Sequence, residues 1–173
     1  MDSTPPSPSP VVKFLTAALP ALGAFVAILG AALITRSVIG GPVLPLVVAS
    51  MGASAVLLFC AAESPLAAWW PFFGGHICSV LVGVAAARWV PDMALASAVA
   101  VGGAIVAMRL LGCMHPPGGA AALTAVVGGP AVAKAGFYFL LVPVGINMVA
   151  LALLVLLFRR AEAALGARTL RRC

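Results

Sequence analysis

The sequence predicts an all-α protein that crosses a membrane as a bundle of about six helices, and three observations support this. Of its 173 residues, 64% are hydrophobic and only 8% are charged. A soluble domain has about 25% charged residues, so this chain lacks the polar surface of a water-soluble fold. Long charge-free stretches recur between the few charged residues. Runs of proline and glycine interrupt these stretches, which predicts that two of the spans are broken helices.

Charged residues separate the first three predicted spans. Residues 14–35 form the first span. Residues 37–62 form the second, in which the GGP run at 40–42 and Pro45 make the first third non-helical, so that the helix strengthens from Gly52. The third span follows Glu63, with a helix expected from about Ile77 to Trp89.

The second half of the chain gives three further spans. The fourth runs from Met93 through Arg109 to about Cys113, and the sixth covers residues 137–158. The fifth combines a proline-glycine break with residues 120–127. Six crossings place both ends of the chain on one side of the membrane. Basic residues near both ends make that side cytoplasmic in an inner (cell) membrane: Lys13, Arg159, Arg160, Arg168, Arg171 and Arg172.

Composition also divides the chain into regions. Residues 1–12 are rich in proline and serine and are expected to be a disordered tail, followed by a single transmembrane domain over residues 13–160. Residues 161–173 form a basic cytoplasmic tail. Although the net charge is +6, basic residues beside a membrane span set its orientation and contact lipid headgroups. We therefore expect membrane lipid and not nucleic acid as a partner. The small residues are also compatible with a homo-oligomer.

A weak internal repeat relates the two halves of the domain. Residues 52–58 (GASAVLL) resemble residues 119–125 (GAAALTA), and each segment follows a proline-glycine run. The repeats would cover residues 14–90 and 93–158. Because each would contain three spans, the halves would have inverted topology, and broken segments at matching positions indicate a binding site. Chance similarity of small residues is the alternative explanation.

The most informative segment is residues 114–120 (MHPPGGA), a break that carries an ionisable histidine within an apolar stretch. Irregular backbone at membrane depth is tolerated only within protein or beside a water-filled cavity. We expect the helices that begin near Gly52 and Gly119 to direct their N-termini at one pocket in the middle of the membrane. Helix N-termini carry free N–H groups and partial positive charge, which suit an anion. Pro116 and Pro117 would form the break itself. The candidate substrate-binding residues are Arg109, His115, Gly118, Gly119, Gly52, Ser54, His76 and Thr124.

These motifs resemble the HPP family of integral membrane proteins. The resemblance rests on residues 115–120 (HPPGGA) preceded by 108–110 (MRL), and on upstream blocks at 52–59 (GASAVLLF), 63–67 (ESPLA) and 74–76 (GGH). Residues 68–71 (AWWP) depart from the Gln-Pro pair that is usual in the family. Some family members are linked to nitrite transport. The resemblance therefore implies a transporter or channel for a small inorganic anion, with nitrite as the first candidate.

Each candidate residue also has a structural explanation. Arg109 could extend to lipid headgroups, His115 could bond freed carbonyl groups, and His76 could cap its helix. Asn147 is expected to form an interhelical hydrogen bond. Glycines 74, 75, 83, 102 and 103 are expected to let helices pack closely. A proton-coupled mechanism through His115 or His76 is open, because histidine gains and loses its proton near physiological pH.

Two other classes of function compete with transport. A metal-handling protein would use Cys113, Met114, His115 and His76, but the spans contain no H-x-x-x-H pair and no carboxylate partner. A non-transporting membrane subunit is the other class. The cysteines form no C-x-x-C pair and are expected to be small buried hydrophobic residues. We expect no enzymatic activity, no metal and no cofactor.

Overall fold

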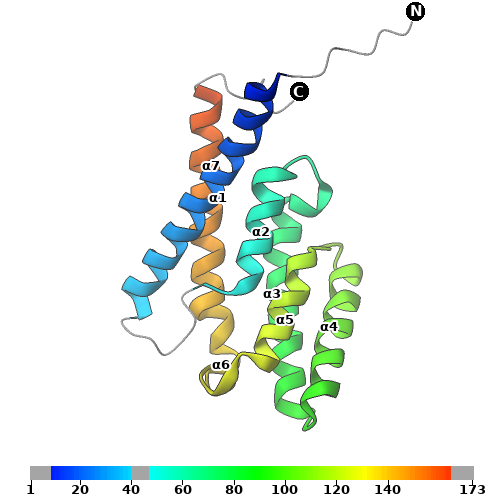
Figure 1. Cartoon of the computed structure of the whole chain (residues 1–173). Helices are drawn as coiled ribbons and strands as arrows, with labels where there is room; N and C mark the ends of the chain where they lie inside the picture. Colours follow the sequence, from blue (N-terminus) through cyan, green and yellow to red (C-terminus); the bar gives the residue numbers. More distant parts are fainter. Residues whose placement is uncertain (1–8, 40–46, 165–173) are drawn as a thin grey trace, which may run out of the picture.

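A computed structural model describes residues 9–39 and 47–164, and these residues form helices without any strand (Figure 1). The all-α prediction is confirmed. The helices are α1 (Pro10–Ile39), α2 (Ala49–Cys60), η1 (Pro65–Ala67), α3 (Trp69–Trp89), α4 (Met93–Leu110), α5 (Pro116–Val127), α6 (Gly129–Ala135), η2 (Leu140–Gly145) and α7 (Ile146–Ala164).

Four segments in the described part of the chain are long and apolar enough to cross a membrane. They are Pro10–Ile39, Trp69–Trp89, Met93–Leu110 and Leu140–Ala164. The apolar helices α2 and α5 have 12 residues each, so each is about 18 Å long, against about 30 Å for the hydrocarbon core. The chain is thus a multi-pass membrane protein. Six complete crossings stay a prediction.

The two short helices lie between two pairs of long ones. In Figure 1, α2 and α5 run in opposite directions and contact each other. α3 packs against α4 and α5, while α7 packs against α1 and α2. Exchanging the two halves of the chain would preserve this pattern of contacts. The pattern therefore favours the inverted repeat, which remains a prediction. The first turn of α1 and the last turn of α7 lie at the same end of the bundle (Figure 1).

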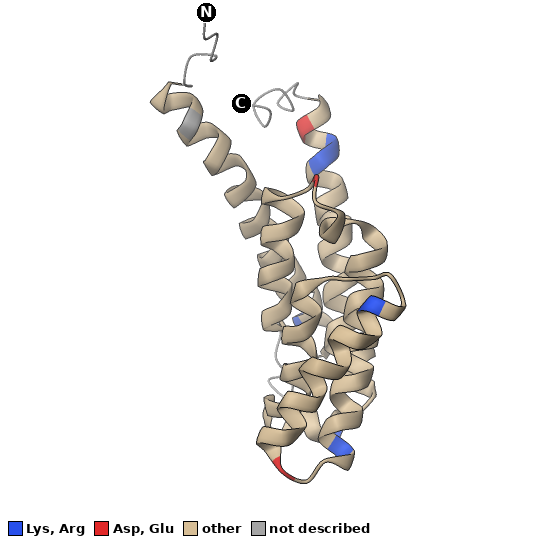
Figure 2. Ribbon diagram, turned by 90° about the vertical axis from the view of Figure 1, so that its right-hand side faces the viewer, with Lys and Arg blue, Asp and Glu red and all other residues tan. Residues whose placement is uncertain are grey.

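Charged residues occupy few places on the ribbon (Figure 2). Several basic residues lie in the last turn of a helix, where a positive charge interacts favourably with the helix dipole. They are Arg36 in α1, Arg88 in α3, Arg109 in α4 and Lys134 in α6. Asp92 caps the start of α4, because its Oδ1 accepts a hydrogen bond from Leu95 N at 2.7 Å. The apolar faces between these positions are left to contact lipid.

The predicted helix starts were too late in the sequence. α3 begins at Trp69 and not near Ile77, since Pro71 falls in the first turn, where a missing N–H breaks no helical bond. Likewise, α1 begins at Pro10, within the segment that was predicted to be a disordered tail. Residues 40–42 and Pro45, which were predicted to be non-helical, lie outside the described residues.

The helices of the second and fifth spans also begin before the predicted positions. α2 begins at Ala49 and not at Gly52. α5 begins at Pro116, with both prolines at its first two positions, which proline favours. Pro116 and Pro117 therefore start this helix and do not interrupt one. The turn between α4 and α5 lies just before them and contains Gly112 at φ +63°.

α3 and α5 approach each other closely through glycine. A Cβ atom at Gly83 would lie 2.8 Å from Ala122 Cα. The predicted packing role also holds for Gly74, Gly75 and Gly103, where an added Cβ would lie within 3.0 Å of another residue. It is wrong for Gly102, where a Cβ would have no atom within 4 Å. Small residues give this close backbone contact in membrane helix bundles.

Candidate functional site

A cluster of buried polar side chains lies where α2, α3 and the start of α5 meet. Ser54, His76 and His115 form it, and each is 0% exposed. Ser54 Oγ lies 2.9 Å from His115 Nε2 and 3.5 Å from His76 Nε2. The two imidazole rings have their centroids 5.0 Å apart. We call these three residues the histidine cluster.

Backbone carbonyl groups fix the orientation of both imidazoles. His76 Nδ1 lies 2.8 Å from the carbonyl oxygen of Phe72 on the preceding turn of α3. His115 Nδ1 lies 2.8 Å from the carbonyl oxygen of Leu66 in η1. The Phe72 ring packs edge-on against both imidazoles. Each ring therefore directs Nε2 toward Ser54.

Glycines allow His115 to approach α3. A Cβ atom at Gly75 would lie 2.6 Å from His115 Cβ and 2.9 Å from the carbonyl oxygen of Cys113. A Cβ atom at Gly118 would lie 2.8 Å from the carbonyl oxygen of Gly75. Larger residues at either position would push the start of α5 away from α3. Gly118, one of the predicted substrate-binding residues, thus lets the backbone of α5 pack closely on α3.

Two more hydroxyl groups lie near the cluster. Ser50 is one turn before Ser54 on α2, and Ser79 is one turn after His76 on α3. Both are buried, and neither hydroxyl has a hydrogen-bond partner within the described residues. A buried hydroxyl without a partner costs about 1–3 kcal/mol, so such groups commonly pair with a ligand, an ion or a water molecule.

The cluster lies inside the apolar bundle and not at its end. His76 follows Trp69, the first residue of α3, by about 10 Å along the helix axis. Ionisable side chains at such depth are rare in membrane proteins and mark pathways for ions, protons or substrates. This position makes the cluster the strongest candidate site.

A second buried polar contact lies at the start of α2. Asn147 Oδ1 accepts a hydrogen bond from Val48 N at 3.0 Å, and Asn147 Nδ2 donates one to Thr35 Oγ1 at 2.6 Å. The contact joins α7 to α1 and α2, so the interhelical role predicted for Asn147 is confirmed. Asn147 contacts the start of α2 much as His76 contacts the start of α5.

The two short helices do not direct their N-termini at one pocket. The start of α5 faces Ser54 in the middle of α2, whereas the start of α2 faces Asn147. Val48 and Ser54 are about 9 Å apart along α2. Pro116 and Pro117 lack N–H groups, and Gly118 N donates to the carbonyl oxygen of His115 at 2.8 Å. The expectation of a shared pocket formed by free amide donors is therefore corrected.

The remaining predicted residues lie apart from the histidine cluster. Arg109 is exposed in the last turn of α4, and Gly52 is exposed on α2. Gly119 is half-buried, and a Cβ atom there would have no neighbour within 4 Å. Thr124 Oγ1 donates to the carbonyl oxygen of Ala120 at 2.7 Å within α5. Of the eight predicted residues, the structure joins Ser54, His76 and His115, with Gly118 packed beside them.

Two thiols also lie close to the cluster. Cys78 and Cys113 are buried, with their Sγ atoms 3.9 Å apart. Within residues 9–39 and 47–164, no three His, Cys, Asp or Glu side chains gather in a way that could hold a metal ion. A thiol pair alone offers fewer ligands than a structural metal site requires.

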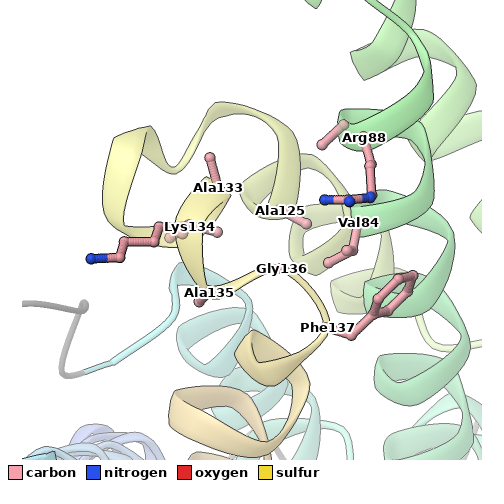
Figure 3. Close-up of a pocket in the computed structure, with 10 residues that line it drawn as sticks. Val84, Arg88, Ala125, Ala133, Lys134, Ala135, Gly136 and Phe137 are labelled. Carbon is pink, nitrogen blue, oxygen red and sulfur yellow. The ribbon is translucent and has the colours of Figure 1, made fainter.

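A separate pocket of about 460 Å³ lies between the end of α3 and α6 (Figure 3). Arg88 reaches toward it, whereas the ammonium group of Lys134 points away. None of the predicted site residues lines it. Arg88 follows His76 by about 18 Å along α3, so the pocket is distinct from the cluster.

Sequence reasoning missed several residues around the cluster. Phe72 and the carbonyl group of Leu66 orient the histidines, and Ser50 and Ser79 add hydroxyl groups. The spacing of Ser50 and Ser54, and of His76 and Ser79, places each pair on one helix face, and this signal was available in the sequence. The contact with Leu66 depends on tertiary structure, and no local sequence pattern predicts it.

The apolar helices of spanning length, packed around a buried polar centre, define a polytopic membrane protein. The family described as HPP, transmembrane region, matches residues 9–166. The chain belongs to this family, which confirms the resemblance inferred from its motifs.

Two curated relatives are transmembrane proteins of Dictyostelium discoideum. One is 42% identical over 118 residues, which cover 64% of this chain and 38% of the relative. The other is 39% identical over 101 residues, which cover 56% of this chain and 35% of the relative. The matched regions thus span little more than a third of these relatives. No solved structure matches the chain.

Proposed function

We propose that this protein is a membrane transporter or channel for a small monovalent anion, with nitrite as the first candidate substrate. The histidine cluster carries the proposal, because Ser54, His76 and His115 are fully buried within an apolar bundle. Polar and ionisable groups are costly to bury within a membrane protein, so those that are present usually serve a function. The link between some members of the HPP family and nitrite transport supports the choice of substrate.

Passage through the cluster requires movement, because all three side chains are inaccessible. The helix contacts suggest which parts would move. One group contains α3, α4 and α5, and the other contains α1, α2 and α7. In transporters with inverted repeats, one such group rocks against the other around a site at their boundary. Ser54 lies in one group and both histidines lie at or within the other, so this motion would open the cluster.

A panel of anions in proteoliposomes tests the proposal. Purified protein should take up nitrite faster than protein-free liposomes, with nitrate, formate and chloride measured beside it to define selectivity. A preference for one small monovalent anion is the expected result. Equal flux with and without protein for every anion would refute transport and favour a non-transporting membrane subunit.

Arg109 is proposed to act outside the cluster. Its side chain is exposed in the last turn of α4, at the end of the helix that leads to His115. Arg109→Ala should therefore raise the KM for nitrite a few-fold, because an exposed positive charge attracts anions toward an entrance. The effect should diminish at high salt, where exposed charges are screened. Complete loss of uptake in a folded variant would place Arg109 in the site itself.

Metal handling is a second candidate because the buried Cys78 and Cys113 thiols are 3.9 Å apart. Titration with a soft metal ion, with and without Cys113→Ser, distinguishes this function from anion transport. Stoichiometric binding that requires Cys113, together with no anion flux, would favour it.

A further inference from the structure

The hydrogen-bond partners of the two histidines determine where their protons lie. A carbonyl oxygen only accepts hydrogen bonds, so Nδ1 of His76, 2.8 Å from Phe72 O, carries a hydrogen. The same argument places a hydrogen on Nδ1 of His115, 2.8 Å from Leu66 O. A neutral imidazole has a single N–H group. In the neutral state, therefore, both Nε2 atoms are bare acceptors.

Ser54 is the hydrogen-bond donor that these two atoms share. Its hydroxyl lies 2.9 Å from His115 Nε2, 3.5 Å from His76 Nε2 and 2.9 Å from the carbonyl oxygen of Ser50. A hydroxyl group has one hydrogen to donate, so it can satisfy only one of the three acceptors at a time. The neutral histidine cluster is thus short of donors.

This shortage matters for an anion, which only accepts hydrogen bonds. A neutral cluster offers an entering anion two bare nitrogen atoms and one contested hydroxyl group. Protonation of either Nε2 would turn an acceptor into a charged donor, and charged donors form the strongest hydrogen bonds to anions. The added positive charge would also neutralise the anion, which burial in an apolar interior requires.

We propose that the histidine cluster binds one proton on Nε2 together with each monovalent anion, so that the pair crosses the membrane without net charge. This inference rests on the proposed function. The proton comes from the aqueous phase on one side and is released with the anion on the other. No covalent bond forms or breaks apart from the N–H bond. Uptake should therefore increase as the external pH falls.

Other titratable and charged groups lie on the elements around the imidazoles. They are Cys60 on α2, Glu63 before η1, Cys78 and Arg88 on α3, Arg109 on α4, Cys113 before α5, and Arg159, Arg160 and Glu162 on α7. Glu63 and Arg109 are exposed, and the Cys78 and Cys113 thiols face each other. Arg159 donates to the carbonyl oxygen of Leu58 at 3.2 Å and lies over the Trp69 ring. The histidines are accordingly the proposed proton carriers.

The composition of the chain allows a direct test, because it contains two histidines and both lie in the cluster. Protein labelled with 15N-histidine, purified with a histidine-free tag and placed in lipid nanodiscs, reports on these two rings alone by NMR. At neutral pH, both Nε2 atoms should be bare and both Nδ1 atoms protonated. Saturating nitrite should protonate one Nε2. Two bare Nε2 atoms with nitrite bound would overturn the inference.

Flux measurements separate this inference from the proposed function. Proteoliposomes that contain a pH-sensitive dye should record one proton entering with each nitrite, after subtraction of the flux in protein-free liposomes. A potential imposed with potassium and valinomycin should leave the rate unchanged. Nitrite uptake driven by the potential without proton entry would overturn proton coupling and leave transport standing. The absence of uptake for every anion would overturn both.

Discussion

Replacing Ser54 by alanine is expected to lower nitrite uptake by about tenfold or more. The substitution removes the hydroxyl group that contacts both imidazoles, at 2.9 Å and 3.5 Å, while alanine fits the same space. A hydrogen bond to a charged group contributes about 1.5–3 kcal/mol, and each 1.4 kcal/mol corresponds to about tenfold in an equilibrium constant. The measurement is initial nitrite uptake in proteoliposomes with equal amounts of reconstituted protein.

Ser97→Ala is the matched control for this variant. Both serines donate to the carbonyl oxygen of the residue four positions earlier, Ser54 to Ser50 and Ser97 to Met93. Ser97, however, is only half-buried on α4, and its hydroxyl bonds within that helix and not to the cluster. Ser97→Ala should take up nitrite as the unmodified protein does. Equal uptake by both variants would show that the Ser54 hydroxyl group is not part of the anion pathway.

Gly83→Ala should destabilise the protein, and more strongly than the other added methyl group proposed below. The new methyl group would lie 2.8 Å from Ala122 Cα, and the backbone of α5 cannot rotate away as a side chain would. Overpacking of this kind costs about 1–3 kcal/mol. Thermal unfolding in detergent should show a lower midpoint for Gly83→Ala than for the unmodified protein.

Gly102→Ala provides the comparison, because a methyl group at this helical position would meet no atom within 4 Å. Alanine is favoured over glycine within a helix by about 1 kcal/mol, so this variant should be as stable as the parent or more so. If both variants unfolded at the same temperature, the result would contradict the close packing of α3 on α5 at Gly83.

Much of the fold could be predicted from the sequence. Composition and charge-free stretches identified the membrane class and the positions of the long helices, since these depend on local hydrophobicity. The helix starts were predicted less well. Pro116 and Pro117 were predicted to break a helix, and the third helix was predicted to start only after Pro71. Each of these prolines instead lies in the first turn of a helix, where proline is tolerated. Whether a proline starts a helix or interrupts one depends on the conformation of the backbone that follows it.

The candidate site was predicted in part. The histidines and Ser54 were chosen for their chemistry, and the structure brings them together from α2, α3 and α5. Arg109 was chosen because it lies near the break in the sequence, yet its side chain is exposed. The start of α2 contacts Asn147, and the start of α5 contacts His76 and Ser54. These contacts depend on packing between segments that are distant in the sequence. Local sequence patterns carry no direct signal for such pairing.

Nitrite uptake by the unmodified protein and by His115→Asn, measured side by side, tests the role of the cluster most directly. Asparagine is a favoured residue at a helix N-cap and retains an amide donor for the carbonyl oxygen of Leu66, but it lacks the Nε2 atom that faces Ser54. We predict uptake by the unmodified protein and only protein-free background for a folded His115→Asn variant. Uptake by that variant at the rate of the unmodified protein would contradict an anion pathway through the cluster.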